Sequence, residues 1–127
     1  MENFGKILVI DDDSDIGLMM KMILMYKGYS VVLLEKADEV EETLSEHKID
    51  LIFMDMLLSG INGTDVCAKI KSNSQHQTIP LIMMSAHPDA KKICLQAGAN
   101  DFIPKPFDTH DLLAKVANLM KNSTAVS

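Results

Sequence analysis

The sequence predicts a single α/β domain in which a parallel sheet is covered by helices on both faces, and three observations lead to this. The chain has 127 residues, of which 47% are hydrophobic, which matches one compact domain with a sizeable core. Short apolar runs without alternation are typical of strands buried on both faces. Segments with helical spacing lie between these runs, as right-handed crossovers between parallel strands require.

Five segments have the composition of strands. They are residues 6–10 (KILVI), 30–34 (SVVLL), 50–55 (DLIFMD), 79–85 (IPLIMMS) and 101–105 (DFIPK), and the last is the least apolar. The segments between them carry apolar residues at helical spacing, as in Ile16, Met19 and Ile23. We therefore expect a strand followed by a helix, repeated five times.

Residues that start or stop helices lie where this pattern requires them. Gly28 and Gly98 follow predicted helices and are typical of helix C-termini. Thr64, and either Asp108 or Thr109, precede helical segments and are typical N-caps. The predicted helices are therefore short.

Composition restricts the partners and the compartment. Twelve basic against eighteen acidic side chains give a formal charge of −6, so we expect no direct binding of nucleic acid. No apolar run is long enough to span a membrane, so we expect no membrane insertion. Cys67 and Cys94 lie within apolar patterns, which favours buried thiols in a reducing, cytoplasmic setting.

Polar residues follow four of the predicted strands. Ligands of open parallel sheets bind beyond the carboxyl ends of the strands, where the strand order reverses. The residues that end or follow strands are Asp11, Asp12, Asp55, Ser85 and Lys105. We expect all five to face one rim.

Two further acids, Asp13 and Asp15, fall past this rim. They lie in the loop and first turn of the first predicted helix, where a carboxylate caps free amide groups. A calcium loop counted from Asp11 fails, because Ile16 stands where glycine is needed and Met22 where glutamate is needed. We therefore assign Asp13 and Asp15 a structural role.

Three carboxylates at one rim repel one another. At about 5 Å and an effective dielectric constant of about 20, each pair costs roughly 3 kcal/mol, which a bound divalent cation offsets. Mg²⁺ is favoured, because it accepts carboxylates together with water and phosphate oxygens. Zinc is not expected, because no ligand spacing relates the histidines His47, His76, His87 and His110.

A carboxylate beside Mg²⁺ and a lysine is a plausible acceptor of a phosphoryl group. The cations absorb charge on the transferring group while the carboxylate attacks in line. The hydroxyl of Ser85 is placed to hydrogen-bond the bound phosphoryl oxygens. One site thus accounts for all five rim residues.

Four stretches in this order resemble the receiver domain of two-component response regulators over essentially the whole chain. They are ILVIDDD, DLIFMDMLLSGINGTDV, IPLIMMSA and AGANDFIPKPF. Each is modest alone, but together they are highly specific. The resemblance implies a flavodoxin-like, doubly wound, five-stranded parallel sheet in the order 2-1-3-4-5.

The resemblance also implies roles for the rim residues. Asp55 matches the phosphorylated aspartate and Asp12 a direct Mg²⁺ ligand. Asp11 matches a ligand that acts mainly through water, and Leu57 matches the residue whose backbone carbonyl binds the metal. Lys105 matches the lysine that pairs with the phosphoryl group.

Three further positions follow from the resemblance. Ser85 and Phe102 match the switch pair, in which the hydroxyl moves toward the phosphoryl group and the aromatic ring follows inward. The bond between Lys105 and Pro106 matches one that is cis in the family.

Two positions depart from the family pattern. Ser59 stands where proline is common, which we expect to loosen the turn after the acceptor. Only 20 positions separate Ser85 from Lys105, fewer than is usual. We expect a shortened fourth helix that starts near Pro88.

The expected function is a phosphorylation-dependent switch or phosphorelay intermediate. A sensor histidine kinase or a phosphotransfer protein donates to Asp55, and a downstream protein reads the result. The chain is expected to assist only its own phosphorylation and dephosphorylation and not to act as an enzyme on other substrates. We expect one receiver domain over residues 1–127, with a core of about 5–121, a polar C-terminal tail (NSTAVS) and no output domain.

Two alternatives use the same rim differently. A haloacid-dehalogenase-type phosphatase would attack with Asp11 and use Asp13 as acid and base, but the threonine after this pair, a downstream acidic pair and room for a cap are missing. A binding module without phosphorylation, such as a flavin protein, would need a phosphate loop, and DDDSD has the wrong charge for it. A degenerate receiver would have lost part of the acid set, which is complete here.

Overall fold

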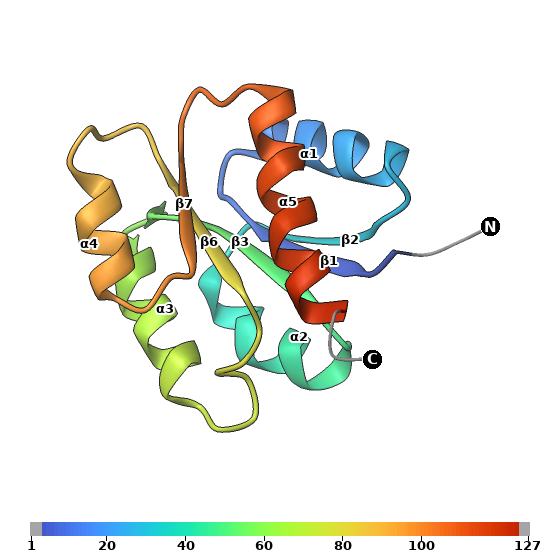
Figure 1. Cartoon of the computed structure of the whole chain (residues 1–127). Helices are drawn as coiled ribbons and strands as arrows, with labels where there is room; N and C mark the ends of the chain where they lie inside the picture. Colours follow the sequence, from blue (N-terminus) through green and yellow to red (C-terminus); the bar gives the residue numbers. More distant parts are fainter. Residues whose placement is uncertain (1–3, 125–127) are drawn as a thin grey trace.

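The computed structural model describes residues 4–124, and its centre is a five-stranded parallel sheet with the order β2-β1-β3-β6-β7 (Figure 1). All four pairs of neighbouring strands are parallel. The strands are β1 (Lys6–Ile10), β2 (Ser30–Leu34), β3 (Leu51–Asp55), β6 (Leu81–Ser85) and β7 (Asp101–Pro104). The predicted sheet and its strand order are confirmed, and the predicted third, fourth and fifth strands were one or two residues too long.

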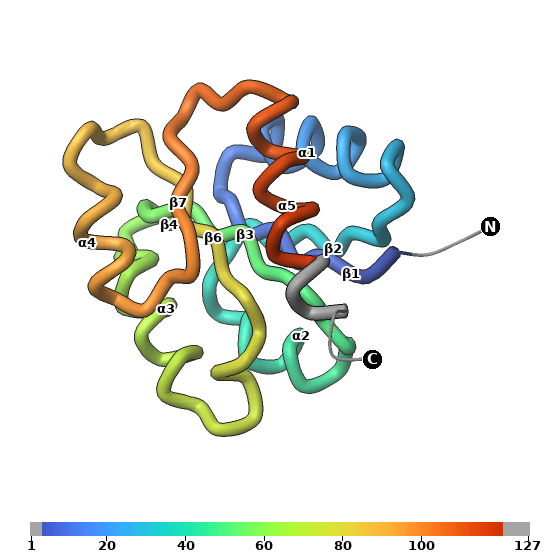
Figure 2. The backbone as a smooth tube through the Cα atoms, in the orientation of Figure 1, coloured from blue at the N-terminus to red at the C-terminus, as the bar shows by residue number. Residues whose placement is uncertain are grey.

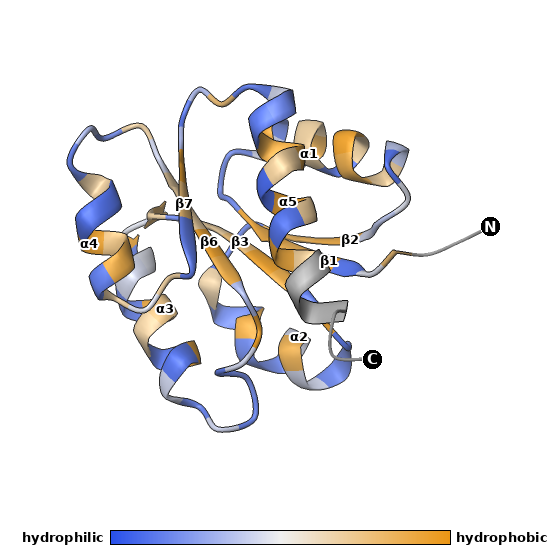
Figure 3. Cartoon of the chain, viewed as in Figure 1, coloured by the Kyte–Doolittle hydropathy of each residue, from blue (hydrophilic) through white to orange (hydrophobic). Residues whose placement is uncertain are grey.

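The sheet is apolar because its central strands are covered on both faces. Residues 7–10, 51–54 and 81–84 are completely buried, and these strands are among the most hydrophobic parts of the chain (Figure 3). Strand β2 lies at the edge of the sheet and is only half-buried. The three strands with a neighbour on each side are therefore the fully buried ones.

Two sets of helices cover the two faces of the sheet. Helices α1 (Ser14–Tyr26) and α5 (Thr109–Thr124) share one buried cluster, in which Met20 and Val116 pack with Phe53 of β3. Helices α2 (Val40–Glu46), α3 (Gly63–Ser72) and α4 (Ala90–Gln96) share the other, together with the short 3-10 helix η1 (Ala37–Glu39) that precedes α2. The chain path in Figure 2 shows the first set on one side of the strands and the second set on the other.

The helix ends follow the predicted caps with one exception. The Asp13 carboxylate accepts hydrogen bonds from the amides of Asp15 and Ile16 and so caps α1. Gly28 and Gly98 follow α1 and α4 with positive φ angles of 101° and 109°. The predicted start at Thr64 was wrong, because the side chain of Asn62 caps α3 by accepting from the Thr64 amide.

The start of α5 agrees with one of the two predicted candidates. The Asp108 carboxylate accepts a 2.8 Å hydrogen bond from the amide of His110, in the first turn of the helix. Helix α5 then continues to Thr124, so the part of the predicted polar tail up to that residue is helical. Residues 125–127 of that tail lie outside the described residues.

Two other segments differ from the expectation. Helix α4 is short, as predicted, but it begins at Ala90 and leaves Pro88 in the preceding loop. Strands β4 (Leu57–Leu58) and β5 (Ile61–Asn62) form an antiparallel hairpin that was not predicted. The turn at Ser59 is therefore a defined hairpin turn and not a loosened loop.

Every helix described between residues 4 and 124 is too short or too polar to span a lipid bilayer.

Candidate functional site

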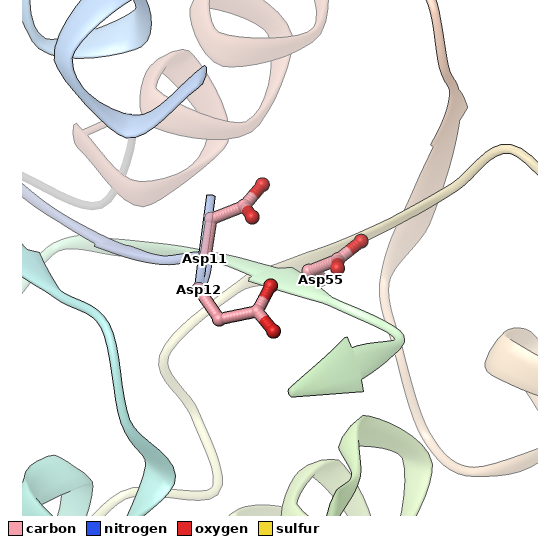
Figure 4. Close-up of side chains that lie close together, drawn as sticks. All are labelled: Asp11, Asp12 and Asp55. Atoms are coloured by element: carbon pink, nitrogen blue, oxygen red, sulfur yellow. The ribbon is translucent and has the colours of Figure 1, made fainter. Parts of the chain in front are cut away.

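Three carboxylates converge at the carboxyl end of the sheet. Asp55 is the last residue of β3, and Asp11 and Asp12 directly follow the neighbouring strand β1. One oxygen of each lies within 4.8 Å of the others, and Figure 4 shows the side chains pointing to a common space. The convergence predicted from the strand ends is confirmed.

Asp11 is the most buried member of this acid cluster (Asp11, Asp12 and Asp55). The residue is 2% exposed, and both of its carboxylate oxygens have hydrogen bonds. Oδ1 accepts from the Asp13 amide at 2.9 Å, and Oδ2 accepts from the Lys105 ammonium at 2.7 Å. A buried carboxylate with two such bonds is held in one orientation.

Lys105 bridges two of the acids. Its Nζ lies 2.7 Å from Oδ2 of Asp11 and 3.1 Å from Oδ1 of Asp55. The residue follows β7, and its amide donates to the carbonyl of Ser85, so the ends of β6 and β7 are joined there. The Lys105–Pro106 bond is cis, as the resemblance implied.

The surroundings of the three acids disfavour the state in which all of them are ionised. Burial raises the pKa of Asp55, the Lys105 ammonium partly offsets this, and the charges of Asp11 and Asp12 raise it again. Burial by itself would lower the pKa of Lys105, but its hydrogen bond to Asp11 and the charges of Asp11 and Asp55 outweigh burial and leave that pKa raised. Lys105 contacts two of the three acids, so the cluster carries negative charge that this cation does not balance.

The Asp12 carboxylate is held by the hairpin. Ser59 donates two hydrogen bonds to Oδ2 of Asp12, from its amide at 3.0 Å and from its hydroxyl at 3.1 Å. This contact was not predicted from the sequence. The Ser-Gly pair between two short apolar stretches is the local signal that could have predicted the hairpin turn.

Ser85 and Phe102 lie beside the rim in different surroundings. Ser85 ends β6 and is 6% exposed, and its Oγ accepts a 3.0 Å hydrogen bond from the His87 amide. The Phe102 ring is already inside the core cluster and is 6% exposed. The inward position that the resemblance assigns to the switched state is thus present in this structure.

The donor set fits a hard divalent cation. Carboxylate oxygens from two adjacent strands are ligands that Mg²⁺ prefers, and the cluster has no sulfur or imidazole member. Asp11 and Asp12 could contribute from the β1 side and Asp55 from β3, with the Leu57 carbonyl on the following strand β4. A bound cation would neutralise charge that Lys105 alone does not balance.

Comparison with known proteins identifies similar chains. The family model described as "Response regulator receiver domain" matches residues 7–117. The DNA-binding response regulator MtrA of Mycobacterium tuberculosis is 32% identical over 120 residues, covering 92% of this chain and 51% of that protein. The phosphate regulon transcriptional regulatory protein PhoB of Rhizobium meliloti is 28% identical, covering 93% of this chain and 53% of that protein. The chain therefore spans about half the length of these curated relatives.

Solved structures share the fold. A putative response regulator from Chloroflexus aurantiacus has a TM-score of 0.87 at 30% identity, covering 91% of this chain and 97% of that one. A two-component response regulator from Clostridium difficile has a TM-score of 0.86 at 30% identity, covering 94% and 98%. The receiver domain of the sensor histidine kinase PA1611 from Pseudomonas aeruginosa, solved with a magnesium ion in its active site cleft, has a TM-score of 0.83 at 24% identity, covering 91% and 97%. The comparisons do not support the haloacid-dehalogenase alternative.

Proposed function

Since the chain belongs to the family of response regulator receiver domains, we propose that it accepts a phosphoryl group on Asp55 and acts as a signalling switch or phosphorelay intermediate. The observation that carries the proposal is the meeting of three carboxylates with Lys105 at one rim. Asp55 is partly accessible there, whereas Asp11 is buried. Of the two acids that contact Lys105, Asp55 is therefore the one that an incoming phosphoryl donor can reach.

The phosphoryl donor is a phosphohistidine of a sensor kinase or of a phosphotransfer protein. An oxygen of Asp55 attacks the phosphorus, a new P–O bond forms, and the P–N bond breaks with its electron pair left on the imidazole. The Lys105 ammonium, 3.1 Å from Asp55 Oδ1, stabilises the negative charge on the transferring oxygens. The product is an acyl phosphate on Asp55.

Mg²⁺ is the cofactor that we propose for this site. When bound, it would supply positive charge beside the transferring group. We assign direct ligation to Asp12, Asp55 and the Leu57 carbonyl. Asp11 is assigned contact through water, because both of its oxygens already accept hydrogen bonds within the protein.

The switch is proposed to operate through Ser85. Phosphorylation adds negative charge and acceptor oxygens at Asp55, and these favour the state in which the Ser85 hydroxyl faces them. In the present structure Ser85 Oγ accepts from the His87 amide, so rotation of the hydroxyl would alter the loop before α4. Phe102 is already buried, so we assign the ring a supporting role in the switched packing.

The proposed output is docking to another protein. Strand β7 lies beside β6, the strand that ends at Ser85, and helices α4 and α5 precede and follow β7 in the chain. Lys91 and Lys92 on α4 and His110 on α5 are exposed. We assign no direct contact with nucleic acid to this chain, because its formal charge is −6. The chain is proposed to catalyse no reaction of another substrate, and to work in the cytoplasm, where its kinase partners phosphorylate it.

Mass spectrometry of the intact protein tests the proposal. The chain is incubated with Mg²⁺ and acetyl phosphate, and we expect the gain of one phosphoryl group at Asp55. The Asp55→Asn variant should gain none, and the matched variant Asp65→Asn, changed at an exposed position on α3, should behave as the wild type. Failure of the folded, Mg²⁺-loaded protein to react with acetyl phosphate or with a histidine kinase would overturn the proposal.

A second assay separates this function from a phosphatase. Steady turnover of a phosphomonoester that is lost in Asp11→Asn and kept in Asp55→Asn would identify Asp11 as the nucleophile. We expect the wild type to show no such turnover.

A further inference from the structure

The turn between β4 and β5 places Ser59 against the acid cluster. Leu58 pairs with Ile61, so Ser59 and Gly60 form a two-residue turn. Their φ angles are 42° and 84°, and two successive positive values are typical of the type I′ turns that join hairpins. Ser59 thus adopts a conformation that residues with a side chain rarely take.

The conformation of Ser59 has a specific consequence at Asp12. Its amide and its hydroxyl both donate to Oδ2 of Asp12, at 3.0 and 3.1 Å. Hydrogen bonds to a charged acceptor are the stronger ones, and two on the same oxygen fix the rotation of the carboxylate. Because both end on Oδ2, they do not occupy Oδ1.

Each acid of the cluster is held in a different way. Asp11 is buried and held by the Asp13 amide and Lys105, and Asp55 is held by Lys105. Asp12 is exposed, so burial does not restrict its rotamers. The two hydrogen bonds from Ser59 are therefore what directs the Asp12 side chain toward the other acids.

A proline could not perform this role. Its ring fixes φ near −65° and it has no amide hydrogen, so it can neither adopt the turn at 42° nor donate to Asp12. Serine at this position provides both the amide and the hydroxyl. The departure from the common family residue therefore changes how the metal site is supported.

We propose that Ser59 is a positioning residue that holds the Asp12 carboxylate toward Asp55, so that the cluster is preorganised for Mg²⁺ before the ion binds. The inference rests on the proposed function, because it assumes that the acid cluster binds Mg²⁺. Ser59 also joins the loop after the phosphoryl acceptor to the loop after β1. Loss of a hydrogen bond to a metal ligand typically weakens metal binding by about tenfold or more, and we expect about tenfold here because the site is exposed.

Calorimetric titration of the full chain with Mg²⁺ tests the inference, with two variants of Ser59. Ser59→Ala removes the hydroxyl and keeps the strained φ, whereas Ser59→Gly removes the hydroxyl and relieves the strain. We expect both to weaken Mg²⁺ binding by about tenfold. The matched control Ser72→Ala, in which the lost hydroxyl donates to the Ala68 carbonyl on α3, should bind as the wild type.

A kinetic readout separates positioning from a purely structural role. With acetyl phosphate, the Mg²⁺ concentration for half-maximal phosphorylation should rise by the same factor in both Ser59 variants, while the rate at saturating Mg²⁺ stays close to that of the wild type. If Ser59 only shaped the turn, Ser59→Gly would bind Mg²⁺ as well as the wild type or better. That result, or unchanged affinity in both variants, would overturn the inference.

The same titration distinguishes this inference from the proposed function. A wild-type protein that binds no Mg²⁺ at millimolar concentrations would overturn the proposed metal site and the role of Ser59 together. A wild type that binds Mg²⁺, with Ser59 variants that bind equally well, would overturn the role of Ser59 alone.

Discussion

Lys105 donates a 2.7 Å hydrogen bond to Oδ2 of Asp11 across 94 positions of the chain. The two residues follow β7 and β1, and strands β3 and β6 lie between these in the sheet. The side chain of Asp11 is 1% exposed and that of Lys105 is 14% exposed, so this pair is shielded from water. It therefore connects the two halves of the rim and is more than a surface ion pair.

Loss of the Lys105 charge should destabilise the metal-free protein. Lys105→Met keeps the apolar stem but leaves Asp11 buried without a cation, which should lower the free energy of unfolding by about 3 kcal/mol. Lys115→Met is the matched control, because Lys115 pairs with Asp101 at 3.2 Å where both side chains are about 30% exposed. That variant should lose less than about 1 kcal/mol. Equal losses in urea unfolding would contradict the burial argument.

Removal of the Asp55 charge should have the opposite effect. The pKa of Asp55 is raised in the folded state, so protonation of this carboxyl stabilises the folded protein. This contribution to the free energy of unfolding is complete at low pH and is lost as the pH rises through the folded-state pKa. Asp55→Asn does not ionise, so with EDTA at pH 7 it should unfold a few degrees above the wild type. The difference should shrink toward pH 4 and reverse when Mg²⁺ is added. The exposed variant Glu42→Gln should show neither change.

Gly63 is needed for the close approach of α3 to the acceptor. A Cβ atom on Gly63 would lie 2.9 Å from the Met56 carbonyl oxygen and closer still to that of Asp55. Gly63→Ala should therefore cost about 1 to 3 kcal/mol of stability and weaken Mg²⁺ binding. Gly17→Ala on α1 meets only Leu33, at an ordinary 3.7 Å, and should stabilise the protein by up to about 1 kcal/mol. Thermal unfolding of both variants checks this contrast.

The buried thiol of Cys67 should make stability fall at alkaline pH. Burial raises its pKa from the ordinary 9.0 of a thiol to about 11, and the charge of Lys71 only partly opposes this. The neutral thiol therefore contributes about 2 to 3 kcal/mol to the free energy of unfolding below pH 9. This contribution is lost as the pH rises to about 11. Urea unfolding at several pH values should show a smaller fall for Cys67→Ala. Parallel pH curves for the two proteins would contradict the prediction.

Phosphorylated Asp55 should hydrolyse slowly. The Leu57 side chain is 70% exposed two positions past the acceptor, and an apolar side chain cannot orient an attacking water. Leu57→Asn supplies an amide there and should shorten the lifetime severalfold, whereas Leu95→Asn on α4 should not. Release of phosphate from the isolated protein measures this. A half-life of only seconds in the wild type would show that another group, such as His87, orients the water.

The parts of the fold that could be predicted are those with a local signal. β1 and β2 agree with their predicted bounds, because an apolar run flanked by polar residues marks a strand without reference to the rest of the chain. The β4–β5 hairpin was missed, because two residues per strand show no periodicity. The N-cap of α3 was misplaced because Asn62 and Thr64 are both residue types that cap helices well, so the local sequence does not choose between them.

The acid cluster could be predicted although the hairpin could not, because one geometric rule brings its members together. Strand ends of a parallel sheet share a rim, so Asp11, Asp12 and Asp55 could be brought together from their positions alone. The partner of each carboxylate could not be predicted in this way. Ser59 lies 47 positions from Asp12, and its donors reach that acid only because the turn has positive φ angles.

The amino-acid order alone determined the strands, the strand-helix repeat and the set of acids at the rim, because these follow from hydrophobic periodicity and from where each strand stops. Only the tertiary structure decided that Lys105 holds Asp11, that Ser59 holds Asp12 and that the Phe102 ring is already buried. Such pairings depend on distances of a few ångströms between segments far apart in the chain. Packing of the whole domain sets those distances, and no local pattern records them.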